Sequence, residues 1–154
     1  MIVAAPDAAD RAVDDVRLAA VLLAIAGGRL GGATLVTPGG DAAEAWLAML
    51  VDLRPDFASV VRVPARTRSE QFGGSIDLAA TLSAGRRIVQ PGLVQRAAGQ
   101  PLVLLGADRW SETDAAHLLA VHDERPERKG RSLLLALENG SDDEARAPKV
   151  LVER

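Results

Sequence analysis

The sequence predicts an α/β fold in three layers, with a parallel sheet covered by helices on both sides. Short apolar runs alternate along the chain with stretches of helical periodicity. The run at 102–105 is apolar throughout and is followed by Gly106, as expected of a strand that is buried on both faces. A chain of 154 residues can bury one core but is too short for two well-packed domains. We therefore expect a single domain over residues 1–154.

The first half of the chain predicts two helices and two strands. Asp14 can cap a helix over 14–26, which Gly27 and Gly28 end. A strand over 33–37 leads through a Pro-Gly-Gly turn to Asp41, which stands where a helix cap belongs. The next helix, 42–53, stops before Pro55; its predicted apolar face is Trp46, Leu47, Leu50 and Leu53. A second strand over 59–63 and a polar loop over 65–71 follow.

The central stretch, 73–106, predicts a helix, a basic interruption and a buried strand. Its helical face is apolar and ends at Gly85; it consists of Ile76, Leu78, Ala79 and Leu82. The residues at 86–92, which begin with Arg86 and Arg87, break the helix, and a helical segment over 93–98 resumes it. The strand over 102–105 comes next.

The last third predicts a helix, a strand and a terminal helical segment. Ser111 and Asp114 can cap a helix that runs to His122. A charged turn at 123–131 separates this helix from a fourth strand at 133–137. A loop at 139–141 then leads to a helical segment over 142–154. The alternation of strands and helices favours parallel strand pairing throughout.

Composition excludes several classes of function. The chain has no cysteine, so disulfides, thiolate metal sites and cysteine nucleophiles are excluded. Its net charge of −3 gives no general attraction to nucleic acid or to an anionic membrane. No apolar run approaches the roughly 18 residues of a membrane span, and the first residues do not resemble a signal peptide. We expect a cytoplasmic protein without a membrane span.

The strand-turn-helix at 35–44 has the layout of a phosphate-binding loop without its chemistry. Such a loop needs backbone amides, a lysine for the terminal phosphates and a hydroxyl for magnesium. Gly39 and Gly40 could supply the amides, but Ala43 and Glu44 occupy the places of the lysine and the hydroxyl. We therefore predict a degenerate loop that does not hold nucleotide. The strand at 102–105 likewise lacks an acidic pair at its end; nearby Asp108 is either a loop or cap residue or a remaining metal ligand.

Other polar residues give weaker signals. His117 and His122 are five residues apart, which suits solvated helix positions better than a metal pair, and we predict no metal site. Basic residues at 125–131 alternate with glutamates and lack aromatic neighbours, which disfavours binding of nucleic acid. Arg86 and Arg87 lie at a protruding break, either as a solvated turn or as a partner-facing loop.

A resemblance to a known family rests mainly on the central stretch. It resembles the N-terminal AAA+ module of the magnesium chelatase D subunit, in which this region is an insertion into the second core helix. The matching positions are Gly74, Asp77, Leu78, Ala79, Gly85, Pro91, Gly92 and Leu93. The final residues, 150–154, resemble the segment that carries an arginine finger in the I subunit, which makes Arg154 a candidate finger. Asn139 falls close to the sensor-1 position of AAA+ proteins, or caps a loop.

The resemblance implies a P-loop NTPase/AAA+ core, truncated before the last core strand and the helical lid. A D subunit also has an integrin-like domain that this chain lacks. D subunits often have eroded nucleotide motifs, which implies a non-catalytic platform for an enzyme that inserts Mg²⁺ into protoporphyrin IX during chlorophyll and bacteriochlorophyll biosynthesis. The implied partners are the ATP-hydrolysing I subunit, which the platform meets through Arg86 and Arg87, and the porphyrin-binding H subunit. ATP and Mg²⁺ act in that complex, and the domain itself holds no cofactor. The alternative is a stand-alone AAA-like scaffold for protein interactions.

Overall fold

Four parallel strands form the central sheet of the computed structural model, which describes residues 8–37, 40–124, 132–140 and 146–152. The strand order is β1-β6-β5-β2, and every neighbouring pair is parallel. The strands are β1 Gly32–Thr37, β2 Val61–Pro64, β5 Pro101–Leu105 and β6 Leu133–Asn139. The central pair, β5 and β6, is almost completely apolar and buried, as the run at 102–105 predicts.

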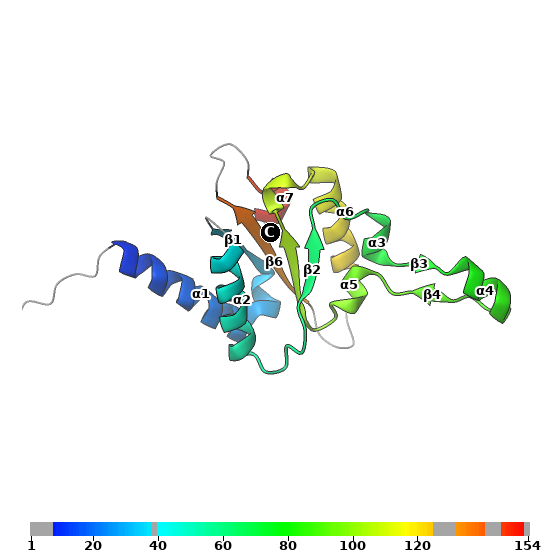
Figure 1. The fold of residues 1–154 in the computed structure, drawn as a ribbon, viewed down its shortest axis with the longest axis horizontal. Helices are drawn as coiled ribbons and strands as arrows, with labels where there is room; N and C mark the ends of the chain where they lie inside the picture. Colours follow the sequence, from blue (N-terminus) through cyan, green and yellow to red (C-terminus); the bar gives the residue numbers. More distant parts are fainter. Residues whose placement is uncertain (1–7, 38–39, 125–131, 141–145, 153–154) are drawn as a thin grey trace, which may run out of the picture.

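Helices cover both faces of this sheet, so the fold has three layers (Figure 1). Alternate strand residues serve opposite faces: Val103 and Leu135 pack with α1 Ala8–Leu30 and α2 Gly40–Leu53. Leu102, Leu104 and Leu134 pack with the second group of helices. That group is α3 Glu70–Gly73, α5 Leu93–Arg96, α6 Glu112–Asp123 and α7 Lys149–Val152. The predicted α/β class is confirmed.

Local signals in the sequence account for several helix positions. In α2, Trp46, Leu47 and Leu50 are buried as expected, whereas Leu53 at the end of the helix is exposed. The cap predicted for α6 is also present, because the Ser111 hydroxyl accepts a hydrogen bond from the Asp114 amide at 3.0 Å. Helix α6 therefore begins where a side chain satisfies a free amide, whereas α2 begins at Gly40, one residue before the predicted cap Asp41.

The central stretch contains the helix that was predicted to end at Gly85, but Ile76 lies in a short strand before that helix. Residues 75–91 form an arm that projects away from the sheet (Figure 1). Two short strands, β3 Ser75–Ile76 and β4 Val89–Gln90, pair antiparallel and carry the helix α4 Leu78–Ala84 beyond them. None of the α4 residues is buried. The predicted apolar face exists, but it faces solvent.

Smaller differences concern element bounds and one histidine. Strand β2 starts two residues later and ends one residue later than the predicted 59–63, and the loop predicted at 65–71 contains the start of α3. Of the terminal helix predicted at 142–154, α7 is the part that the structure describes as helical. His122, expected in solvent, is 3% exposed, and its Nε2 lies 3.2 Å from the Ser132 carbonyl oxygen. The basic residues at 125–131 lie outside the described residues.

The described helices include none with the length and apolar character required to cross a membrane. Among the described residues, no three His, Asp or Glu side chains are grouped so as to hold a metal ion.

Candidate functional site

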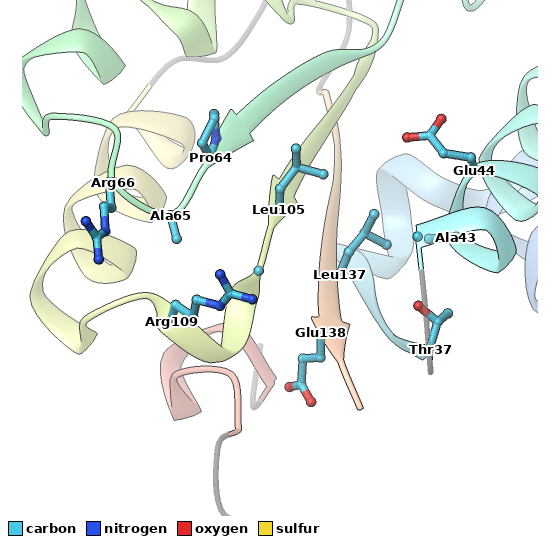
Figure 2. Close-up of a pocket in the computed structure, with 12 residues that line it drawn as sticks. Thr37, Ala43, Glu44, Pro64, Ala65, Arg66, Leu105, Arg109, Leu137 and Glu138 are labelled. Atoms are coloured by element: carbon cyan, nitrogen blue, oxygen red, sulfur yellow. The ribbon is translucent and has the colours of Figure 1, made fainter. Parts of the chain in front are cut away.

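An open cavity of about 860 Å³ lies at the carboxyl ends of the four parallel strands. In open α/β sheets this edge is the usual place for a ligand. Each strand contributes a residue at or near its end, namely Thr37, Pro64, Leu105 and Glu138 (Figure 2). The position of the cavity therefore follows from the fold, and the chemistry depends on the loops that border it.

The first border is the start of α2, where the degenerate phosphate loop was predicted. Gly40 begins this helix and lines the cavity; Gly39 lies outside the described residues. Ala43 is buried, and it offers no cation to a phosphate. The Glu44 carboxylate lies 2.7 Å from the Arg62 guanidinium on β2. Ala43 and Glu44 thus border the cavity, but neither can bind a phosphate or a magnesium ion as the lysine and the hydroxyl would.

The second border follows β5. Gly106 adopts a left-handed conformation, with φ of 61°, and turns the chain into the 3-10 helix η1 Ala107–Arg109. The Asp108 carboxylate is 7% exposed and lies 3.6 Å from Arg109 Nε. An ion pair and a helical position favour the structural role for Asp108 over that of a metal ligand.

Three side chains at the cavity were not predicted from the sequence. Arg66 follows β2 and Arg109 follows β5, and both line the cavity in Figure 2. Glu138 on β6 is 5% exposed, and its Oε1 accepts a hydrogen bond from the Ala147 amide at 2.7 Å. The rule that ligands bind at the carboxyl ends of parallel strands would have identified all three. Asn139, the sensor-1 candidate, ends β6 opposite Thr37 in the strand register.

The arm forms a second candidate site. Arg86 and Arg87 are exposed after Gly85, whose φ of 62° ends α4. The Thr81 hydroxyl accepts a hydrogen bond from the Ile88 amide at 2.9 Å, which ties the arginine turn to the helix. No residue of the arm lines the cavity. Arg154, the candidate finger, lies outside the described residues.

Asp77 organises the arm from its base. Its carboxylate accepts hydrogen bonds from the Ala80 amide and from Gln90 Nε2, each at 2.9 Å, and so joins α4 to β4. The bond from Ala80, which has the larger effect, and the bond from Gln90 lower the pKa of Asp77, because both stabilise the charged carboxylate. A lowered pKa means that the stabilisation is complete at neutral pH and is lost as pH falls through that lowered value.

We expect replacement of Asp77 by Ala to unwind α4 at neutral pH and leave the body folded. The cap is lost, but α4 contributes no buried residue to the core. Cα chemical shifts of residues 78–84 should move to random-coil values, while the thermal midpoint stays close to that of the wild type. In the wild type the same shifts should change only below about pH 4. Ser83→Ala, an exposed change in the same helix, is the control; retention of helical shifts in Asp77→Ala would contradict the role of the cap.

No family model and no curated protein matches this chain. Solved structures do. A structure of the complex between subunits BchI and BchD of magnesium chelatase, based on single-particle cryo-EM, contains a chain with a TM-score of 0.62 and 21% identity. The match covers 89% of this chain and 55% of that one. A crystal structure of a protein from Cytophaga hutchinsonii, predicted to be an ATPase, has a TM-score of 0.55 and 15% identity, covering 92% and 43%.

These similarities establish the fold alone, since both identities are low. The chain has an AAA+-like ATPase fold and spans about half the length of the structures that it matches. The AAA+ part of the predicted fold class is confirmed.

Proposed function

We propose that this chain is a non-catalytic AAA+ platform that docks through its arm onto an ATP-hydrolysing AAA+ partner, as a D-type component of magnesium chelatase. The partner is the I subunit, and the complex inserts Mg²⁺ into protoporphyrin IX. The proposal covers residues 1–154 as one partial AAA+ core, with the porphyrin-binding H subunit as the further member of the complex. The proposal includes Arg154 as an arginine finger that reaches the nucleotide of a neighbouring subunit. This role is based on the resemblance to the I subunit alone.

The observation that carries the proposal is the exposure of the arm. Leu78 and Leu82 are 68% and 76% exposed, and Ile76 and Val89 on the two short strands are about half exposed. The arginine pair lies beside them. Apolar side chains next to exposed arginines are typical of protein interfaces. A chain that used this arm for its own stability would bury these residues, so the arrangement supports a partner surface with apolar pockets and an acidic rim.

The cavity supports the non-catalytic part of the proposal. Phosphoryl transfer depends on cations that stabilise charge on the transferred group and on a magnesium ion held by hydroxyl and carboxylate groups. At the described start of α2, Ala43 and Glu44 occupy the places of the lysine and the magnesium-binding hydroxyl, and the Glu44 carboxylate pairs with Arg62. Arg66 and Arg109 remain as cations at the cavity. They could contact an anion, and Thr37 and Glu138 also line the cavity, but neither lies at the start of α2, where a phosphate-binding loop has its lysine and hydroxyl.

The test uses ATP hydrolysis by the purified I subunit of the same organism. We expect no hydrolysis by this chain alone, and a change in the I-subunit rate when the chain is added. Replacing Arg86 and Arg87 by Ala should weaken the apparent affinity of that effect about ten-fold or more, because truncated interface arginines are frequent hot spots. The control replaces two exposed arginines outside the arm, Arg68 and Arg96, by Ala. It has the same net charge as the arm variant.

Each part of the proposal has its own contrary outcome. Hydrolysis of ATP by the chain alone would contradict the non-catalytic assignment. An I-subunit rate that is insensitive to the chain would contradict the chelatase assignment and favour the stand-alone scaffold. Equal effects of the arm variant and its control would show that charge, and not the arm, governs the interaction.

A further inference from the structure

Helix α1 is apolar on two opposite sides, and the body of the protein covers one of them. Ala20, Leu23 and Ala24 are buried against α2 and the sheet. Two hydrogen bonds fix the orientation of α1 on the body, both at 2.9 Å. Trp46 Nε1 donates to the Val16 carbonyl, and Arg54 Nη1 donates to the Ala24 carbonyl. The opposite side of α1 therefore faces outward.

The outward side carries a continuous apolar stripe, which we define as Leu18, Val21, Leu22 and Ile25. Leu18 lies three and four residues before Val21 and Leu22, and Ile25 lies four and three residues after them, so all four share one face of the helix. Their exposed fractions are 55%, 38%, 50% and 78%. A helix with apolar residues on both sides is normally covered on both sides. The stripe is thus a surface that lacks a partner among the residues that the structure describes.

The pattern of the stripe is symmetric about its own centre. That centre lies between Val21 and Leu22, with Leu18 and Ile25 equally far on either side. One pair of opposite charges follows the same symmetry: Asp14 and Arg29, both exposed, lie equally far from the centre in opposite directions. With 3.6 residues per turn, both also lie close to the line of the stripe.

We propose that the stripe is the interface of a homodimer in which two α1 helices pack antiparallel about a two-fold axis through this centre. Leu18 then faces Ile25 of the second copy, and Val21 faces its Leu22. Asp14 faces the Arg29 of the second copy at each end, so two ion pairs form. A two-fold interface requires a self-complementary surface of this kind. The dimer uses the side of the molecule away from the arm, so both surfaces are available together (Figure 1).

The size of the stripe sets the strength of the dimer. A stripe of two helical turns is much smaller than the roughly 800 Å² per partner of a standard stable interface. We therefore expect a reversible dimer whose population rises with concentration. Sedimentation velocity of the purified chain over the micromolar range should show a monomer–dimer equilibrium.

Two sets of variants test the interface and the antiparallel orientation of its two helices separately. Leu22→Glu should leave monomer at every concentration, because it places a carboxylate in the apolar centre twice per dimer. Leu82→Glu, an equivalent change on the exposed arm, is the control and should keep the dimer. Asp14→Arg and Arg29→Asp should each raise the dimer Kd about ten-fold, and the double variant should restore it, because the antiparallel pairs are then reversed and not lost.

The outcomes decide the proposal. A wild-type chain that stays monomeric at all concentrations would overturn it. A dimer that Leu22→Glu leaves intact would overturn the assignment to α1, provided that circular dichroism shows a folded variant. Failure of the double charge variant to restore the Kd would overturn the antiparallel arrangement. These measurements use the chain alone, so they are independent of the partner that the arm binds.

Discussion

Replacement of Gly92 by Ala should destabilise the protein by about 3 kcal/mol or more, because there is no room for a side chain where the two ends of the arm meet. A Cβ atom at Gly92 would overlap the backbone of Gly74 and of Phe72, and it would lie 2.7 Å from the Gly73 carbonyl carbon. These neighbours are backbone atoms, which cannot move away as a flexible side chain can. The backbone of both ends must therefore shift, and with it the position of α5.

Chemical denaturation followed by circular dichroism measures this effect. The matched control is Gly40→Ala, since the equivalent Cβ atom at Gly40 has open space around it and Gly40 begins a helix. Alanine suits helices better than glycine, so this control should be neutral or slightly stabilising. Similar stabilities for the two variants would show that the ends of the arm are not in close contact.

Replacement of Phe72 by Ala should cost about 3–5 kcal/mol, the usual range for removing a fully buried aromatic ring. Phe72 is 0% exposed and lies in α3, directly before the arm. Its ring stacks on Trp110, with centroids 5.9 Å apart, and meets His117 edge-on at the same separation. The substitution therefore removes a ring that connects α3 with α6 and with Trp110, the residue after η1.

The control for Phe72 is Leu82→Ala, which removes a large apolar side chain that is 76% exposed on the arm. We expect this change to alter the free energy of unfolding by no more than about 0.5 kcal/mol. Urea midpoints of the two variants distinguish the contribution of burial from that of apolar character. Equal midpoints would mean that the ring of Phe72 is not part of the core.

The predictions from sequence succeeded where local pattern and burial coincide. The run at 102–105 is apolar at every position, and the strand it predicts is buried on both faces in the structure. In the arm, the predicted helix that ends at Gly85 is present, but the pattern did not show its exposure: Leu78 and Leu82 form an apolar face, and no part of the core lies behind them. Periodicity shows which side of an element is apolar, and it does not show what that side meets.

The site was predictable in part on the same grounds. Ala43 and Glu44 stand where a lysine and a hydroxyl would be, so the prediction of a degenerate loop needs only the local sequence. Arg66, Arg109 and Glu138 come from three different strand ends, and the sheet order brings them together. The burial of His122 was not predicted because its partner, the Ser132 carbonyl, lies ten residues further along the sequence.

The close contact of Gly74 and Gly92 has a consequence for how such a protein can change over time. Because the two ends of the arm meet, the body is already closed beneath it, and residues 75–91 are attached at a single point. Insertions and substitutions within this segment leave the sheet and its two cores untouched. The sequence and length of the arm can therefore change over evolution with little loss of foldability, because the body folds without it.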